Sequence, residues 1–385
     1  MREAIVTLAA GSAVALALSG CTMPSSTTSE EDPGVSEQAD QALADLEGTV
    51  LSTGPNGEEA SPAADVELTD DQIVEVQDMD LTAAIVMHYG GNDWATAQVD
   101  GLRSEFELLG IEVIAETDAD FKPDKQVSDL ETVLSTKPDI IVSLPIDPVA
   151  SSQAYQAASD AGVTLVFMDN APADMQAGTD YVSVVSADNY GNGVVSAHLL
   201  AKSLGGSGTI GVIFHEADFF VTQQRYDGFT TTLQDEYSDI ELVEETGIAG
   251  PDFAGDAQEA ASAMLTQNPD LDAIWAVWDV PAEGVMAAAR EAGRTDLKIA
   301  TEDLGTNVAI ALAENEMIVG LGAQLPFDQG VAEARLGALS LLGEDTPPYV
   351  AVNALPVDHD NVLEAWTQVY GSDPPAAVTD SYTDD

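Results

Sequence analysis

The chain has 385 residues, which is enough for about two domains of ordinary size. Hydrophobic residues make up 45% of it, so it can bury substantial cores and global disorder is excluded. It carries 68 Asp and Glu against 11 Lys and Arg, and this formal net charge of −57 argues against nucleic acids and anionic lipid surfaces as partners. A solvated acidic shell suited to high salt is the simplest explanation of the charge, and a cationic partner is the alternative.

The start of the chain has the features of a secretory signal. Arg2 precedes an apolar segment over residues 4–20, which is too short and too rich in Ala and Gly for a membrane span. The residues Leu18-Ser19-Gly20-Cys21 resemble the bacterial lipobox, which implies cleavage before Cys21 and lipidation of its thiol. Since Cys21 is the only cysteine, no intrachain disulfide is possible. Residues 1–21 are therefore predicted to be a lipoprotein signal peptide, and the mature chain is expected outside the cytoplasm, anchored to the cell membrane.

Two further segments have the composition of disorder. Residues 22–80 are rich in Ser, Thr, Glu, Asp, Gly and Pro, which predicts a disordered acidic tether between the anchor and the folded part. Residues 371–385 are expected to be a disordered tail.

Apolar runs and amphipathic stretches alternate from residue 81 onward. The first series predicts strands over 82–88, 111–115, 139–144, 163–170 and 181–186, with helices over 95–109, 125–135 and 151–161 between them. The second series predicts helices over 188–204, 222–237, 254–266, 281–292, 307–315, 327–342 and 363–370. Its strands are expected over 209–214, 240–245, 273–277, 298–302, 319–323 and 350–355.

Two successive series of this kind predict an α/β fold of two doubly wound parallel-sheet lobes joined by a hinge. We assign residues 81–186 and 325–343 to an N-terminal lobe. Residues 187–324 and 344–370 are assigned to a C-terminal lobe. Two such lobes that face each other form a cleft, and ligand sites favour the space between domains.

Polar residues follow the apolar strands at the points where the strands stop. Asp169, Asp279 and Asp303 each come directly after one, and ligands of open α/β sheets bind at the carboxyl ends of strands. Amide side chains that supply both donors and acceptors stand at equivalent positions: Asn92, Asn170 and Gln324. Any one of these Asp residues is also compatible with a helix cap. Three together favour a shared site.

Aromatic residues accompany the polar ones in the neighbouring loops. Trp94, Trp278, Phe220 and Phe253 offer flat faces that can cover the C–H side of a ring or polyol. Hydroxyl acceptors beside aromatic faces are typical of a carbohydrate-type site. The alternative for each single aromatic is packing between helices.

From Leu81 to about Pro356 the chain resembles the type I periplasmic sugar-binding proteins, the ribose-binding class of solute receptors for ABC importers. The segments that carry the resemblance are Gly91-Asn92-Asp93-Trp94, Met168-Asp169-Asn170, Ser186-Ala187-Asp188-Asn189, Gln224-Arg225-Tyr226-Asp227-Gly228-Phe229, Asp252-Phe253, Trp278-Asp279, Glu302-Asp303 and Gln324-Leu325-Pro326. This resemblance implies a hinged receptor that closes on a buried sugar and docks on a permease.

The resemblance also assigns pocket residues. The positions that match the ribose-binding pattern are Asn92, Asp169, Phe253, Asp303 and Gln324, with Trp94 in an aromatic place and Arg225 as a structural arginine. The departures are Asn170 and Gln223 for two pocket arginines, Trp278 for an asparagine, and Ala95 for an aromatic. With Asp93 and Asp279 added, the set favours a neutral polyol or a sugar other than ribose. A cationic ligand held over Trp is the alternative.

The leading hypothesis is a monomeric, lipid-anchored solute receptor that delivers a small sugar or polyol to an ABC permease. A receptor of the same fold that feeds a membrane sensor is the second hypothesis, and a glycoside-hydrolysing enzyme is the third. The four histidines lack metal spacing and no Gly-x-Ser-x-Gly elbow occurs, so no metal, cofactor or catalysis is expected. The lipobox and the missing helix-turn-helix argue against a transcription regulator.

Overall fold

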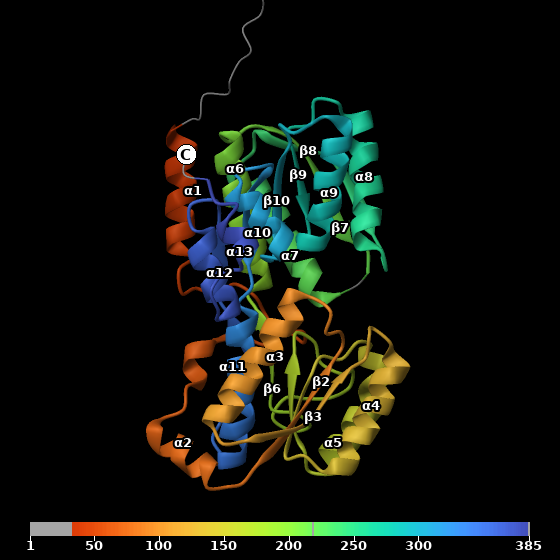
Figure 1. The fold of residues 1–385 in the computed structure, drawn as a ribbon, viewed down its shortest axis with the longest axis vertical. Helices are drawn as coiled ribbons and strands as arrows, with labels where there is room; N and C mark the ends of the chain where they lie inside the picture. Colours follow the sequence, from red (N-terminus) through yellow and green to blue (C-terminus); the bar gives the residue numbers. More distant parts are fainter. Residues whose placement is uncertain (1–32, 218, 384–385) are drawn as a thin grey trace, which may run out of the picture. The chain divides into compact units, whose positions relative to one another are not determined.

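Strands and helices alternate through the two parallel-sheet lobes of a computed structural model, which describes residues 33–217 and 219–383 (Figure 1). The predicted signal peptide with Cys21 lies outside the described residues. The strands are β1 (Ser61–Pro62), β2 (Thr82–Met87), β3 (Glu112–Asp118), β4 (Ile140–Ser143), β5 (Thr164–Met168), β6 (Ser183–Ala187), β7 (Gly208–His215), β8 (Ile240–Ile248), β9 (Ala273–Ala276), β10 (Lys298–Glu302), β11 (Ile318–Ala323), β12 (Tyr349–Val352) and β13 (Leu355–Val357). The helices are α1 (Pro33–Asp45), the 3₁₀ helix η1 (Ala63–Val66), α2 (Asp70–Gln77), α3 (Asp93–Leu108), α4 (Pro123–Thr136), α5 (Pro148–Asp160), α6 (Asn189–Leu204), α7 (Phe220–Glu236), α8 (Phe253–Gln267), α9 (Asp279–Ala292), α10 (Thr306–Ala313), α11 (Pro326–Leu342), α12 (Val362–Tyr370) and α13 (Ala376–Thr379).

The N-terminal lobe is built on a parallel sheet of order β1-β12-β6-β5-β4-β2-β3. Its central strands β4, β5 and β6 are buried on both sides because helices cover both faces. In β4, Ile140 and Val142 pack under α3 and α11, whereas Ile141 packs on the opposite face with Leu130 of α4 and Tyr155 of α5. This arrangement confirms the predicted α/β class with parallel sheets.

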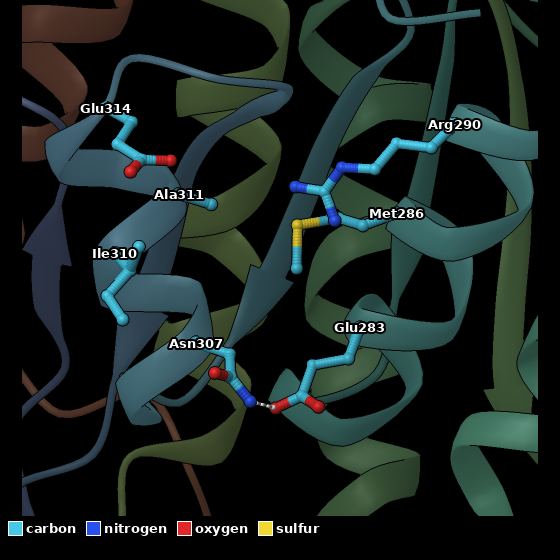
Figure 2. A pocket seen from close by; sticks show the side chains of 7 residues that line it. All are labelled: Glu283, Met286, Arg290, Asn307, Ile310, Ala311 and Glu314. Atoms are coloured by element: carbon cyan, nitrogen blue, oxygen red, sulfur yellow. Dashed lines mark hydrogen bonds between the residues drawn. The ribbon is translucent and has the colours of Figure 1, made fainter. Parts of the chain in front are cut away.

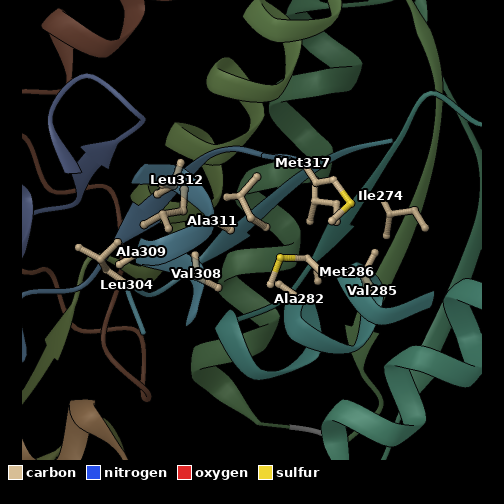
Figure 3. Close-up of a cluster of buried hydrophobic side chains, with 14 of the residues drawn as sticks. Ile274, Ala282, Val285, Met286, Leu304, Val308, Ala309, Ala311, Leu312 and Met317 are labelled. Carbon is tan, nitrogen blue, oxygen red and sulfur yellow. The ribbon is translucent and has the colours of Figure 1, made fainter. Parts of the chain in front are cut away.

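The C-terminal lobe repeats the plan with a sheet of order β13-β11-β10-β9-β7-β8. All of its pairs are parallel except that of β13 with β11. Ile274 of β9 faces a cluster that includes residues of α9 and α10 (Figure 3). Its neighbour Trp275 faces the opposite side and stacks on Phe229 of α7 at a ring distance of 4.6 Å. Because successive side chains of a strand point to opposite faces, β9 contributes to the apolar clusters on both sides of the sheet.

From residue 81 onward, the described part of the chain passes between the two lobes at three places. The first follows β6 and leads into α6, the second follows β11 and leads into α11, and the third separates β12 from β13. Asp188 stands in the first passage, and its backbone N–H donates to the carbonyl of Val352, at the third passage, over 2.7 Å. These passages form the hinge.

The closing strand differs from the prediction. The stretch 350–355 was expected as one strand of the C-terminal lobe, within residues 344–370. In the structure β12 enters the N-terminal sheet beside β6, and only β13 joins the C-terminal sheet, antiparallel to β11. An apolar run shows that a strand is buried but does not show which strand it pairs with, so the lobe boundary of this segment could not be read from the pattern.

The two segments expected to be disordered also differ from the prediction where the structure describes them. In the tether, Ala39 of α1, Val66 of η1 and Val76 of α2 are fully or almost fully buried. In the tail, Val378 of α13 is buried and the backbone N–H of Thr383 donates to the carbonyl of Ala313 over 3.0 Å. Such segments contain few apolar residues, but the apolar residues named here pack against surfaces that the lobes provide.

Candidate functional site

Two strand-end aspartates adopt a backbone conformation that is rare for residues with a side chain. Asp169 follows β5 with φ of 53° and Asp303 follows β10 with φ of 64°. A left-handed conformation in a non-glycine residue costs about 1–3 kcal/mol and persists only where the surroundings hold it. The strain therefore marks both strand ends as candidate functional positions.

Asp303 forms an ion pair with a buried arginine. Arg225 donates from its two terminal nitrogens to the two carboxylate oxygens, with Nη1–Oδ2 at 2.9 Å and Nη2–Oδ1 at 3.3 Å. Gln324 adds a donation from Nε2 to Oδ1 over 2.9 Å. The Arg225 side chain is 3% exposed and that of Asp303 is 18% exposed, so the pair is shielded from water on the arginine side. The prediction that Arg225 has a structural role agrees with this geometry.

Asp169 is buried at the end of the other sheet. It accepts a hydrogen bond from Ser186 Oγ over 2.7 Å. Burial raises the pKa of Asp169 to about 6, against the opposing effects of the Ser186 hydrogen bond and the positive charge of Arg225. The negative charge of Asp303 raises this pKa further. The two strand-end carboxylates of different sheets are thus close enough to act on each other.

Asp279 lies in the first turn of α9, where its Oδ1 accepts from the backbone N–H of Val280 over 2.8 Å. Burial raises the pKa of Asp279 to about 8, and the negative charge of Asp303 adds to the rise. Asp303 therefore acts on both other carboxylates. The structure brings Asp169, Asp279 and Asp303 together, as the sequence pattern indicated.

Aromatic side chains stand beside these carboxylates in both lobes. Trp94 donates from its indole N–H to Gln324 Oε1 over 3.3 Å. Phe253 and Trp278 meet edge to face at 4.9 Å between ring centroids. Trp94 therefore joins the polar network directly, and Trp278 lies next to Asp279 in the chain.

Two histidines that the sequence analysis considered only as metal ligands belong to these aromatic groups. His88 lies 5.8 Å from Trp94 between ring centroids, and His215 lies 5.6 Å from Trp278. Burial lowers the pKa of His88 to about 4 and also lowers that of His215, so both rings are neutral near pH 7. They stand at the carboxyl ends of β2 and β7, so the strand-end pattern that identified the aspartates would also have found them.

The remaining predicted residues have other partners in the structure. Asn92 caps α3 by accepting from the Ala95 N–H over 2.9 Å, and Asn170 accepts from the Ala171 N–H over 3.1 Å. Gln223 is exposed and donates to Asp227 Oδ1, one turn along α7, over 2.8 Å. A role of these three in binding stays a prediction.

Asp93 connects the lobes. Its Oδ2 accepts from the backbone N–H of Thr306 over 3.2 Å and from the Thr306 hydroxyl over 2.7 Å. Asp93 belongs to α3 of the N-terminal lobe, whereas Thr306 begins α10 of the C-terminal lobe. This contact and the Trp94–Gln324 bond hold the two lobes together on the side of the candidate site.

Two cavities lie away from the strand ends. One, of about 280 Å³, lies between α9 and α10. Figure 2 shows the side chains that line it, among which Asn307 donates a hydrogen bond to Glu283 over 3.0 Å. The other, of about 470 Å³, lies between the α1 region, α6 and α7. Neither cavity is lined by any of the predicted ligand-binding residues. We therefore place the candidate site by its chemistry rather than by volume.

Comparison with known proteins identifies the family. A sequence profile described as the periplasmic binding protein domain matches residues 83–345, well over half of the chain. The chain belongs to the periplasmic binding protein family. This confirms the family resemblance found in the sequence. Membership of this family means that the protein lies outside the cytoplasm. It also means that the protein binds a solute for transport and is not an enzyme.

Relatives of this periplasmic binding protein include sugar receptors. A D-ribose/D-allose-binding protein of Pseudomonas aeruginosa is 28% identical over 276 residues, which cover 69% of this chain and 83% of that protein. A ribose import binding protein of Salmonella typhimurium is 24% identical over 268 residues, which cover 68% and 86%.

Solved structures share the fold. The arabinose-binding protein of Geobacillus stearothermophilus matches with a TM-score of 0.67 and 24% identity over 74% of this chain and 98% of that one. A solute-binding protein of Agrobacterium vitis, solved with bound allitol, matches with a TM-score of 0.64 and 25% identity over 74% and 98%.

In the part of this periplasmic binding protein that the structure describes, every helix is too short or too polar to cross a membrane. Within the same part of the chain, no group of three or more His, Cys, Asp or Glu side chains is arranged to hold a metal ion.

Proposed function

We propose that this protein is the solute receptor of an ABC importer and that its ligand is a neutral sugar or sugar alcohol. The observation that carries the proposal is the convergence of Asp169, Asp279 and Asp303 from separate strand ends beside Trp94 and Trp278. Charged oxygens accept strong hydrogen bonds from hydroxyl groups, and indole faces cover C–H surfaces. A polyhydroxylated ring or chain offers both kinds of group.

The balance of charge at the site favours a neutral ligand. Arg225, the buried cation at this site, is paired with Asp303 and so is not free to hold an anionic solute. Asp169, with a pKa of about 6, is largely ionised at pH 7, whereas Asp279, with a pKa of about 8, is largely protonated. The site therefore carries about one net negative charge. It offers both acceptors and a hydroxyl-type donor, which suits a polyol.

The named ligands of the relatives belong to the same chemical class. The relative from Pseudomonas aeruginosa is named for D-ribose and D-allose, and one solved neighbour holds allitol. At the identities given above, these names support a sugar or sugar alcohol as the class of ligand and do not identify one compound.

The cellular setting completes the proposal. Cys21 in Leu18-Ser19-Gly20-Cys21 would carry the lipid that anchors the receptor outside the cytoplasmic membrane. A monomer that closes on its ligand would dock on the permease. Crosslinking of the sugar-bound receptor in its native membrane tests this partner: an ABC permease supports import, and a sensor kinase supports the signalling alternative.

A calorimetric titration tests the class of ligand. We expect D-ribose, D-allose, D-arabinose or allitol to bind the purified soluble chain and to raise its melting temperature by mass action. Choline serves as the cationic probe, because an acidic surface and the neighbouring rings of Trp278 and Phe253 are the features that would hold a cation. Binding of choline without binding of any of the four neutral compounds would refute the proposal.

A further inference from the structure

A chain of hydrogen bonds links the strand-end carboxylates of the two lobes. Ser186 Oγ donates to Asp169 Oδ1 over 2.7 Å, and Asn189 Nδ2 donates to Ser186 Oγ over 3.0 Å. Arg225 Nε donates to Asn189 Oδ1 over 3.1 Å, while its terminal nitrogens hold Asp303. Five side chains thus form one unbroken series, which we call the carboxylate relay.

The carboxylate relay crosses the hinge. Ser186 lies on β6 of the N-terminal lobe, and Asn189 is the first residue of α6 in the C-terminal lobe. Between them the chain makes its first passage from one lobe to the other. Because the other bonds of the relay lie within one lobe, the Asn189–Ser186 bond is the link that joins the two halves.

The relay is shielded from water along its length. Ser186 and Asn189 are 0% exposed, Arg225 is 3% exposed and Asp169 is 6% exposed. In such surroundings a polar group that loses its partner finds no water in exchange, so the energetic effect of each bond is large. Neighbouring bonds also polarise one another.

Donors and acceptors permit one arrangement of protons. Arg225 can only donate, which fixes the carbonyl oxygen of Asn189 toward it and the amide nitrogen toward Ser186. Ser186 then accepts from Asn189 and turns its own hydrogen to Asp169. The chain therefore runs from a cation at one end to a carboxylate at the other, and its dipoles all favour the ionised form of Asp169.

We propose that Ser186 and Asn189 are positioning residues that hold the ligand-binding carboxylates Asp169 and Asp303 in register across the hinge. The inference rests on the proposed function, since it takes both carboxylates as ligand contacts. It adds that the two lobes do not present their carboxylates independently. A change at the hinge residue Asn189 should be felt at Asp169, with which it shares no direct hydrogen bond.

The pKa of Asp169 can report a change in the relay, because the groups that act on this carboxylate are known. Ser186 donates to it, Arg225 attracts its charge and Asp303 repels it. From α11 and β12, its charge acts on Glu333 and Tyr349, whose own pKa values burial raises. Asp169, with a pKa of about 6, is the group whose ionisation the experiment follows.

The first experiment is a ¹³C NMR titration of the Asp169 side-chain carboxyl in the ligand-free protein, with the resonance assigned by Asp169→Asn. Ser186→Ala should raise the pKa of Asp169 by about one unit, because the lost bond stabilises the charged form. Asn189→Ala should cause a smaller shift of the same sign. Ser183→Ala is the matched control, since Ser183 is also buried in β6 but donates to the Val184 carbonyl over 3.3 Å. Ser186→Thr keeps the hydroxyl and should restore the original titration.

The second experiment measures binding of whichever of D-ribose, D-allose, D-arabinose and allitol the unaltered protein takes. Ser186→Ala should weaken binding about tenfold at pH 7. The pH at which this variant loses binding on acidification should rise in parallel with the pKa of Asp169. An Asp169 titration that is the same in Ser186→Ala and Ser183→Ala, or unmoved by Asn189→Ala, would overturn the relay. If none of the four compounds binds the unaltered protein, the proposed ligand class fails, and the NMR titration still decides the relay by itself.

Discussion

At the scale of single residues, Asp303 is the counter-ion of a buried arginine as well as a candidate ligand contact. Its carboxylate holds both terminal nitrogens of Arg225, whose side chain is 3% exposed. Removal of the carboxylate would leave that arginine charged, buried and short of a partner. A loss of ligand binding in an Asp303 variant would therefore combine a lost contact with a damaged site.

We expect Asp303→Ala to lower the free energy of unfolding of the ligand-free protein by roughly 3–5 kcal/mol, the usual effect of breaking a buried ion pair. Urea denaturation measures this directly. Asp296→Ala is the control, because Asp296 pairs with Arg294 at the surface with its side chain 69% exposed, and exposed pairs contribute at most about 1 kcal/mol. Equal effects of the two substitutions would contradict the account of Asp303.

The ionisation of Asp169 and Asp279 predicts opposite pH trends for stability and binding. Their pKa values in the folded state, about 6 and about 8, lie above the usual value for Asp, so protonation favours the folded state. The stability that they contribute is complete below pH 4 and is lost as the pH rises through 6 and 8. Asp169, in contrast, accepts hydroxyl hydrogen bonds more strongly in its ionised form, so its contribution to binding weakens as the pH falls through 6.

The melting temperature of the ligand-free protein should therefore rise as the pH is lowered from 8 to 5, while its affinity for a neutral sugar falls. Differential scanning fluorimetry and calorimetric titration over this range measure the two trends. Asp169→Asn should flatten the part of both trends near pH 6. Stability and affinity that change in the same direction would count against the assignment.

At the scale of elements, the segment before β2 is tied to the hinge. Ser52 is 4% exposed, and Asp188 accepts from its backbone N–H and its hydroxyl, each over 2.8 Å. The Ser52 hydroxyl also accepts from the Tyr190 N–H over 3.0 Å. On either side of this point, α1 packs on α6 of the C-terminal lobe, and β1 pairs with β12 of the N-terminal lobe. The segment therefore connects both lobes beside their first passage.

Ser52→Ala should destabilise the protein by about 1–3 kcal/mol, because it leaves the Tyr190 N–H without its partner and removes one of the hydrogen bonds that Asp188 Oδ1 accepts. Thr49→Ala in the same segment is the control, since the Thr49 hydroxyl makes an exposed bond to the Asp45 carbonyl. Urea denaturation of both variants provides the measurement. A Ser52→Ala variant as stable as Thr49→Ala would show that this connection contributes little.

The elements also show what the sequence could predict. Apolar runs that stop at a polar residue located β5 and β10, and with them Asp169 and Asp303, because a strand buried on both faces leaves a clear signal. The partner of β12 and the docking of α1 left no such signal, since both depend on tertiary contacts. The carboxylate relay could not be predicted either, because Asn189 and Arg225 are 36 residues apart and meet only when α6 and α7 pack.

At the scale of the whole molecule, the charge dominates the conditions under which the fold is stable. The chain carries a formal net charge of −57 with 11 Lys and Arg, so most carboxylates have no cationic partner. Mutual repulsion of this kind is weakened by salt, whose screening length falls from about 10 Å at 0.1 M to about 3 Å at 1 M. The melting temperature should therefore rise with added NaCl. A melting temperature that stays constant up to 1 M would contradict this expectation.

The central claim is that carboxylates from both lobes converge on one ligand. A crystal structure of the soluble chain with D-allose or allitol bound tests it most directly. Ligand hydroxyls are expected within hydrogen-bond distance of both Asp169 and Asp303, with Trp94 or Trp278 against the C–H surface. A ligand held instead in the cavity between α9 and α10, with both aspartates untouched, would contradict it.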